Sequence, residues 1–199
     1  MRVKTTFASL LIPASFLFSA FFLSCAGSNT NTETVNTDTV TSATGDVAGQ
    51  RAEAMINGTY GDTTVSGTAT FTADNGKVKM DLQLNVPAKA NQSVAVHIHE
   101  TGDCGDTGMA AHGHWNPTNK QHGKWGEGEF HSGDIGNVQL DASGNGSLTL
   151  ETDLWSLGGD STTNILNRAI IVHGGVDDYK SQPSGNAGNR IGCGVIKGM

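Results

Sequence analysis

Two histidines, His97 and His99, are separated by a single residue in the segment 94–100 (VAVHIHE), within an apolar alternation. Successive side chains of a β-strand point to opposite faces, so His97 and His99 are predicted to share one face and the apolar residues the other. Two imidazoles about 6.5 to 7 Å apart along a strand can converge on one metal ion. The pair alone is also compatible with histidines that are only solvated or hydrogen-bonded.

Further metal donors follow, and all seven histidines lie between residues 97 and 173. The segment 112–137 carries five side chains that can act as donors: His112, His114, His122, His131 and Asp134. His173 ends the apolar run AIIV, where a strand can present it beside His97 and His99. Imidazole nitrogens with one carboxylate suit zinc or copper, whereas calcium prefers an oxygen-rich set. Because six or more donors exceed the need of one tetrahedral site, two neighbouring sites are predicted.

The elements that must position these donors are short strands. Residues 77–86 (KVKMDLQLNV) alternate without a break, which is typical of a half-buried strand. Residues 63–73 precede them across the turn DNG, and residues 137–151 repeat the pattern with a turn around 144–146. The prediction is an all-β fold of about eight antiparallel strands, as a sandwich or barrel. Residues 101–131 and 174–189 show no alternation, and loops of that length are typically functional or disordered.

Composition limits the size and the partners of the protein. A chain of 199 residues fits one domain plus extensions, and its 27 glycines favour short, punctuated strands. The formal net charge of -7 argues against a nucleic-acid-binding protein, which needs a basic surface. An anionic substrate would need a local positive patch instead.

The N-terminus predicts export. Arg2 and Lys4 precede an apolar run over residues 7–23, which is followed by small residues around Cys25. Residues 1–24 resemble a bacterial lipoprotein signal, in which Cys25 becomes the lipid-bearing first residue, although Phe22 stands where leucine is usual. Simple secretion or a retained membrane anchor are the alternatives, since about 17 apolar residues is at the lower edge of a spanning length. The prediction is a membrane-anchored lipoprotein of the cell envelope or periplasm.

Residues 25–51 are predicted to form a flexible polar tether between this anchor and a domain over residues 52–199. Their Thr, Asn, Ser and Gly side chains bury too little to offset the entropy of ordering. If Cys25 carries a lipid, Cys104 and Cys193 remain, and an even remainder in an exported protein favours a disulfide.

Five segments, in order along residues 52–196, resemble those of the copper,zinc superoxide dismutase family. They are HIHETGDC, HWNP with a histidine eight residues after its own, HSGDIGNV, VHGGVDD and GNAGNRIGCGVI. The resemblance implies an eight-stranded antiparallel Greek-key β-barrel or sandwich with two long functional loops. It also implies copper and zinc as cofactors and superoxide as the substrate.

Site roles follow from the resemblance residue by residue. The implied copper ligands are His97, His99, His114 and His173. The implied zinc ligands are His114, His122, His131 and Asp134, so the imidazole of His114 would bridge the two metals. Asp177 would accept hydrogen bonds from one copper-bound and one zinc-bound histidine, with Asp178 as an alternative one residue away.

The resemblance also implies a substrate guide, a disulfide and a reaction cycle. Arg190 would guide superoxide to the copper, and Cys104 and Cys193 would form the disulfide. The family's steering lysines lie in the loop before the arginine, where only Lys180 is available, so Lys120 and Lys124 are further candidates. In the implied cycle superoxide alternately reduces and reoxidises copper, while His114 takes up and returns a proton. The family allows a homodimer.

Some residues and two other functions fall outside this interpretation. His112 has no counterpart among the ligands and is predicted to be a solvated loop residue. The tryptophans are predicted to be packing residues: Trp115, Trp125 and Trp155. A non-catalytic domain for metal binding or copper delivery, and a structural adhesion lipoprotein, are the rival functions. The first should lack a bridging ligand, a zinc ligand or the arginine, and the second does not explain the spacing of the donors.

Overall fold

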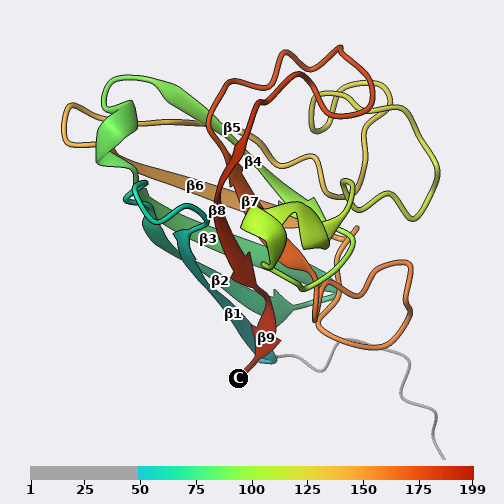
Figure 1. The fold of residues 1–199 in the computed structure, drawn as a ribbon. Helices are drawn as coiled ribbons and strands as arrows, with labels where there is room; N and C mark the ends of the chain where they lie inside the picture. Colours follow the sequence, from blue (N-terminus) through green and yellow to red (C-terminus); the bar gives the residue numbers. More distant parts are fainter. Residues whose placement is uncertain (1–48) are drawn as a thin grey trace, which may run out of the picture. The chain divides into compact units, whose positions relative to one another are not determined.

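Strands dominate the structure, a computed structural model that describes residues 49–199 (Figure 1). The strands are β1 (Arg51–Gly58), β2 (Ser66–Asp74), β3 (Lys77–Asn85), β4 (Ser93–His99), β5 (Gly136–Gln139), β6 (Asn145–Thr152), β7 (Ala169–His173), β8 (Arg190–Val195) and β9 (Lys197–Gly198). Two short 3-10 helices are η1 (Pro87–Lys89) and η2 (Asp106–Ala111). The predicted signal segment, Cys25 and the tether up to residue 48 lie outside the described residues. Within residues 49–199, no helix has the length and apolar character needed to cross a membrane.

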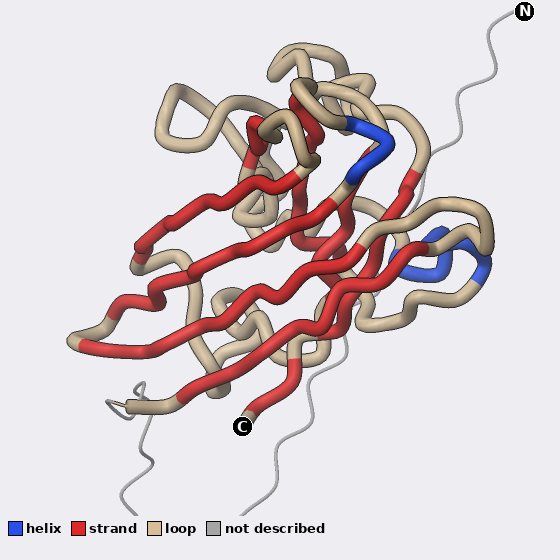
Figure 2. The backbone as a smooth tube through the Cα atoms, turned by 90° about the vertical axis from the view of Figure 1, so that its left-hand side faces the viewer, coloured by secondary structure: helices blue, strands red, loops and turns tan. Residues whose placement is uncertain are grey.

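Eight strands form one antiparallel path in the order β5-β4-β7-β8-β1-β2-β3-β6, and β9 pairs with the start of β1. The path bends into a nearly closed barrel, which the turned view in Figure 2 shows as strands running past one another around a common interior. Strands β3 and β4, adjacent in the chain, pair instead with β6 and β7, which is a Greek-key crossover. The predicted fold is confirmed. Strand β1 begins at Arg51, one residue before the predicted domain start.

The interior of the barrel holds one apolar core. Along β3 the alternation expected from the sequence places Val78, Met80 and Leu82 fully inside. Trp155 is also buried, and it packs against Phe71 in an edge-to-face arrangement with the ring centroids 6.3 Å apart. The indole N–H of Trp155 donates to the carbonyl of Ser132, 2.8 Å away, so core packing fixes a loop that carries candidate donors.

Residues 137–151 differ from the expected pattern. The turn lies at residues 141–144, where the Gly144 N–H donates to the Asp141 carbonyl and Gly144 has a φ of +80°. Gly146 lies within β6 rather than in the turn. The flanking strands do not form a ladder with each other, because β5 pairs with β4 and β6 pairs with β3. Strands β5 and β6 therefore lie at the two ends of the strand path, and their proximity nearly closes the barrel.

Long loops gather at one end of the barrel. In Figure 1 the yellow segment after η2 and the red segment between β7 and β8 lie side by side at the upper right. A side chain of the second loop, Gln182, bonds the backbone of His122 in the first. The two loops belong to the segments 101–131 and 174–189, in which the sequence showed no alternation. They contact each other through this hydrogen bond.

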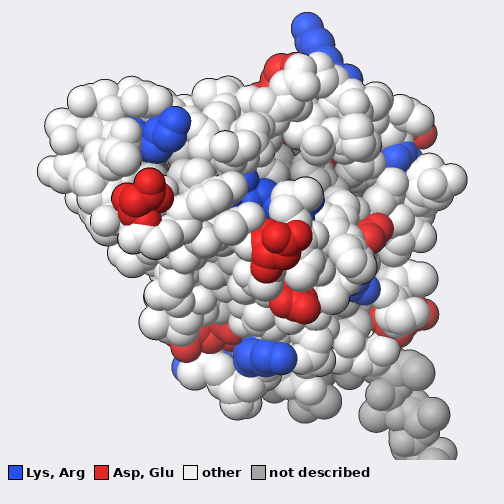
Figure 3. Space-filling view, viewed as in Figure 1, with Lys and Arg blue, Asp and Glu red and all other residues white. Residues whose placement is uncertain are grey.

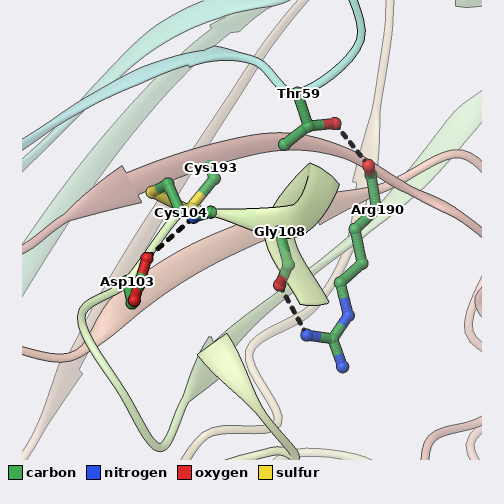
Figure 4. Close-up of a disulfide and its surroundings, with 7 residues drawn as sticks. Thr59, Asp103, Cys104, Gly108, Arg190 and Cys193 are labelled. Atoms are coloured by element: carbon green, nitrogen blue, oxygen red, sulfur yellow. Dashed lines mark hydrogen bonds between the residues drawn. A yellow bond between two sulfur atoms is a disulfide. The ribbon is translucent and has the colours of Figure 1, made fainter. Parts of the chain in front are cut away.

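A disulfide ties the start of the 101–131 segment, before η2, to the barrel. Cys104, in the loop before η2, bonds Cys193 in β8 across 89 residues of chain. Figure 4 shows the bond beside the start of η2. Cys193 belongs to the same strand, β8, as Arg190. The predicted Cys104–Cys193 disulfide is confirmed.

Candidate metal centre

Strand β4 presents two of the predicted donors. It lies between β5 and β7 in the barrel wall, and its alternation sends Val96 and Ile98 into the apolar core. His97 and His99 therefore share the opposite face, and both are buried. Strand β7 ends at His173, where the pairing with β8 shifts register between Val172 and His173. Such an irregularity turns a side chain away from its regular direction, and here it brings His173 beside His99.

A ring of backbone hydrogen bonds brings the loop donors to β4. The Trp115 N–H donates to the Ile98 carbonyl, the Gly133 N–H to the Trp115 carbonyl and the Ile98 N–H to the Gly133 carbonyl, at 2.9, 3.0 and 2.9 Å. Position 133 has no room for a side chain, because a Cβ there would lie 2.3 Å from the Ile98 carbonyl oxygen. Residues next to this ring, His114 and Asp134, are thereby held behind β4.

Four histidines form the first cluster: His97, His99, His114 and His173. One ring nitrogen of each lies within 4.8 Å of the others. The Nε2 atoms of His99 and His173 are 3.4 Å apart, close to the roughly 3.3 Å that separates ligands each about 2.0 Å from a tetrahedral ion. All four predicted copper ligands are thus brought together.

Three histidines and a carboxylate form the second cluster: His114, His122, His131 and Asp134. The Nδ1 atom of each histidine lies close to a carboxylate oxygen of Asp134, at 2.8, 3.0 and 3.2 Å respectively. Asp134 is fully buried, and its Oδ2 also accepts backbone N–H groups of Gly123 and His131. The four predicted zinc ligands are thus brought together around one point.

His114 belongs to both clusters. Its Nδ1 faces Asp134, whereas its Nε2 is buried and has no hydrogen-bond partner in the described part of the chain. The ring centroid of His114 lies 4.0 Å from that of His97 and 5.3 Å from that of His122. One imidazole therefore stands between two donor sets and offers one nitrogen to each.

Unsatisfied nitrogens show that the residues fit metal ions. Among residues 49–199, four buried ring nitrogens have no hydrogen-bond partner: His97 Nδ1, His114 Nε2, His122 Nδ1 and His131 Nδ1. Those of His122 and His131 approach Asp134 closely but are not aligned as donors to it. Lone pairs aimed at a common centre rather than at each other produce this geometry, and buried polar groups are costly when they stay unpaired. The donor chemistry, imidazoles with one carboxylate, suits copper and zinc.

Asp177 connects the two clusters from behind. Its Oδ2 accepts from His97 Nε2 and its Oδ1 from His122 Nε2, each at 2.9 Å. Asp178 is exposed and accepts instead from the backbone and hydroxyl of Ser181. Of the two aspartates considered from the sequence, Asp177 faces the histidines. It fixes one nitrogen of each ring and leaves the other, Nδ1, directed to its cluster.

Burial keeps the first cluster neutral. Burial lowers the pKa of His114 to about 4 and that of His173 to about 3. Burial also lowers the pKa of His97 and of His99. A neutral imidazole has the free lone pair that a metal ion requires, so these rings are prepared to bind near neutral pH.

Carboxylates dominate the second cluster. Burial by itself would lower the pKa of His122, but Asp134 and Asp177 raise it to about 9. Burial would raise the pKa of Asp134, yet the hydrogen bond from His114 and the close rings of His122 and His131, together with the His131 backbone N–H, hold it well below its usual value. The ionised carboxylate of Asp134 therefore supplies negative charge that a proton on His122 or a metal cation can neutralise.

A pocket of about 680 Å³ opens onto the first cluster. His99, His114 and His173 line it, whereas fully buried His97 does not. Among the described residues that line it, the lysine and arginine side chains are Lys120 and Arg190, with Glu100 as an opposing carboxylate. Over the face shown in Figure 3, basic side chains are scattered rather than joined in one broad patch. The positive charge at the pocket therefore comes from Lys120 and Arg190 and not from a broad basic surface.

Arg190 is held rigidly at the pocket. Its guanidinium donates to the carbonyl of Gly108 at 2.7 Å and to the carbonyl of His112. Its own carbonyl accepts from the hydroxyl of Thr59, and Figure 4 shows the contacts with Thr59 and Gly108 beside the disulfide. The remaining donors of the guanidinium are available to a small anion.

The candidate lysines differ in their surroundings. Lys120 lines the pocket, and its backbone is fixed by reciprocal hydrogen bonds with the Asn116 side chain at 2.8 and 3.0 Å. Lys124 forms an ion pair with Glu127. Lys180 does not line the pocket. Only Lys120 of the three is placed where it can add to the field of Arg190.

Four supporting residues were missed from the sequence. The Asn137 side chain bonds both backbone groups of Asp177, at 2.9 Å each, and the Gln182 side chain does the same for His122. The carbonyl of His112 accepts from both His99 Nδ1 and Arg190. The fourth is Gly133. No spacing rule marks an amide or a carbonyl that acts across distant loops, and only the crowding of glycines around 133 offered a signal.

A nearly closed antiparallel barrel that carries two buried donor clusters joined by one imidazole defines a metalloprotein with a paired metal centre. Comparison with known proteins narrows this class. The profile of the copper/zinc superoxide dismutase family matches residues 65–196. The chain belongs to this family.

Relatives and a solved structure agree with this assignment. A copper–zinc superoxide dismutase of Yarrowia lipolytica is 39% identical over 146 residues, which cover 68% of this chain and 92% of the relative. Copper–zinc superoxide dismutase 1 of Aquifex aeolicus is 38% identical over 136 residues, covering 66% and 79%. A crystal structure described as the clock protein EA4 superposes with a TM-score of 0.66 and 32% identity, covering 77% and 97%. The predicted enzyme class, superoxide dismutase with copper and zinc, is confirmed.

Proposed function

We propose that the first cluster binds copper, that the second binds zinc and that His114 bridges them during dismutation of superoxide. The position of His114 supports this most directly, since its two nitrogens face different donor sets. Four imidazoles without a carboxylate suit a redox-active copper ion, whereas three imidazoles and one carboxylate suit zinc. Copper held by the first cluster would supply one-electron redox chemistry, by which one superoxide is oxidised to dioxygen and a second, with two protons, is reduced to hydrogen peroxide.

The chain's own residues fix the ligand rings and transfer a proton. His114 Nε2 lies at the first cluster and lines the pocket, so it is the atom placed to take up a proton and return it. Asp134 holds the other nitrogen, Nδ1, at 2.8 Å, so the ring keeps its position while Nε2 changes partner. Asp177 holds His97 and His122 in fixed orientation, as partners behind metal ligands do.

Substrate guidance is proposed for Arg190 and Lys120. Superoxide is a small anion, and a protein with a net charge of -7 must attract it through a local field. Arg190 is fixed by carbonyl groups on one side, which leaves donors free for the pocket. Lys120 adds a second positive charge on the same pocket wall or rim. Glu100 opposes them, so the two cations together set the sign of the field.

We further propose that the protein acts outside the cytoplasm, as a lipoprotein anchored through Cys25 that protects the cell envelope from superoxide. The Cys104–Cys193 disulfide supports export, because such bonds persist in oxidising compartments. The signal-like residues 1–24 and the polar composition of residues 25–51 support an anchor followed by a tether.

The test is metal content together with superoxide consumption on the same preparation. One copper and one zinc per chain with rapid consumption support the proposal. Bound metal without consumption would instead support metal storage or copper delivery. If the preparation contains neither metal and does not consume superoxide, the result would support the structural lipoprotein.

A further inference from the structure

We infer that Gln182 is a positioning residue. It lies in the loop of residues 174–189, called the pocket loop below. Its side-chain amide holds the backbone of His122 and so fixes the geometry of the second cluster, which is the proposed zinc cluster. This inference rests on the proposed ligand role of His122. Gln182 Oε1 accepts from the His122 N–H, and Gln182 Nε2 donates to the His122 carbonyl, both at 2.9 Å. The same Nε2 donates to the Lys180 carbonyl at 3.3 Å, which keeps the amide tied to its own loop.

His122 depends on this amide. Among residues 49–199 no other group bonds the backbone N–H or carbonyl of His122. The residue is buried, with 3% of its surface exposed. Buried backbone groups that lose their partner are unfavourable, so the loop around His122 would shift if the Gln182 amide were removed.

The pocket loop holds His122 at two points. Asp177 accepts from the ring at Nε2, 2.9 Å away, and Gln182 pairs with the backbone five residues further along the same loop. Gly185 closes the arrangement, because a Cβ there would lie 1.8 Å from Asp177 Oδ1 and 2.7 Å from His122 Nε2. Backbone and ring are therefore fixed together, and Nδ1 of His122 keeps its direction toward Asp134.

The pocket loop is itself a bonded unit. The Gly185 N–H donates to the Ser181 carbonyl, the Asp178 N–H donates to the Gly185 carbonyl, and Asp178 accepts from the N–H groups of Lys180 and Ser181. Gln182 also lines the substrate pocket. One side chain thus joins the wall of the pocket to a zinc-cluster donor.

Gln182→Ala tests the inference in the full-length protein, stripped of metal and titrated with Zn²⁺ against a chelator and separately with Co²⁺. Gln121→Ala is the matched control. It removes the same kind of side chain from the exposed residue that directly precedes His122. His131→Ala identifies the cobalt absorption bands of the second cluster, because His131 offers a donor only there. Supporting residues behind metal ligands typically contribute 10- to 100-fold in affinity. We expect Gln182→Ala to lose about 10-fold in zinc affinity and to change those cobalt bands, with Gln121→Ala unchanged.

Three outcomes separate the claims. Wild-type affinity and unchanged cobalt bands in Gln182→Ala would overturn the positioning role. A lower unfolding temperature of metal-free Gln182→Ala, with unaltered affinity and bands, would also overturn it by showing a structural role alone. A wild-type protein without His131-dependent cobalt bands would overturn the proposed zinc cluster itself.

Discussion

His112 has an exposed imidazole, yet its backbone carbonyl accepts hydrogen bonds from His99 and from Arg190. The prediction of a solvated loop residue holds for the side chain only. Its φ of 61° and ψ of -143° lie in a region that is costly for a residue with a Cβ. The conformation turns the carbonyl toward the pocket, so a residue without a ligand role still fixes one candidate copper ligand and the anion guide.

Charge at the pocket gives a prediction for Lys120. Lys120→Ala removes one of the two cations on the pocket, so reaction with superoxide is expected to slow about two- to fivefold at low ionic strength, a part of the 10- to 1,000-fold that a complete field can supply. The difference should shrink at high salt, where the screening length is a few ångströms. Pulse-radiolysis or stopped-flow rates against ionic strength measure it.

Lys124→Ala is the control, because Lys124 is paired with Glu127. Arg190→Ala should be slower than either variant while its metal content stays normal. Equal rates for Lys120→Ala and the wild type at low salt would remove Lys120 from substrate guidance.

At the scale of elements, the ring of backbone bonds that joins β4 to the loop donors gives a second prediction. Gly133→Ala introduces a Cβ 2.3 Å from a backbone oxygen, which no side-chain rotation can relieve. We expect the unfolding free energy to fall by roughly 2 to 3 kcal/mol, as in overpacked sites, and metal retention to weaken. Denaturant unfolding and metal analysis check both.

Gly61→Ala is the matched control, because a Cβ there meets nothing within 4 Å. If Gly133→Ala were as stable as Gly61→Ala and kept its metals, the loop would not depend on this contact.

Elements with local signals could be predicted from the sequence. The alternation in β3 and the paired histidines of β4 each follow from a strand period of two, which is a property of the chain itself. Residue type marked His114, His122 and His131 as possible donors, but their assignment to particular sites came from the resemblance, because their convergence depends on contacts between segments far apart in the chain. The amides of Asn137 and Gln182 were missed for the same reason. The pairing of β5 with β4 rather than β6 was missed because a turn sequence does not specify which strands become neighbours.

For the whole molecule, the lowered histidine pKa values predict how metal-free protein responds to acid. His114, with a folded pKa of about 4, and His173, with about 3, bind protons more weakly when folded than at their ordinary value of 6.5. Stability contributed by keeping them neutral is therefore lost as pH falls below about 6.5, and the loss continues to about 3. His122 acts oppositely: its pKa of about 9 adds stability that is complete below 6.5 and disappears as pH rises through 9.

Four histidines of the first cluster have lowered pKa values, whereas the pKa of His122 is raised, so we expect the effect of the four to dominate. Calorimetry of metal-free protein should show a lower unfolding temperature at pH 5 than at pH 7. The metal-loaded form should change less, because bound ions exclude protons from the rings. An equal or higher unfolding temperature of metal-free protein at pH 5 would contradict this.

The proposed lipid anchor at Cys25 gives a prediction for the N-terminus. Cys25→Ser should move the protein from the membrane fraction to the soluble fraction, because the lipid would have no attachment site. Specific activity should not change, since the domain that carries the centre begins after the tether. Fractionation with activity assays on both pools measures this, and continued membrane association would favour the retained anchor. The homodimer that the family allows stays a prediction.

The central claim is that His114 serves two ions at once, and metal retention in single variants tests it most directly. Protein loaded with copper and zinc, then dialysed, is analysed for both metals by mass spectrometry. His173→Ala should lose mainly copper and His131→Ala mainly zinc, because each belongs to one cluster. His114→Ala should lose zinc and weaken copper retention together. Full retention of both metals by His114→Ala, with undiminished superoxide consumption, would contradict the account.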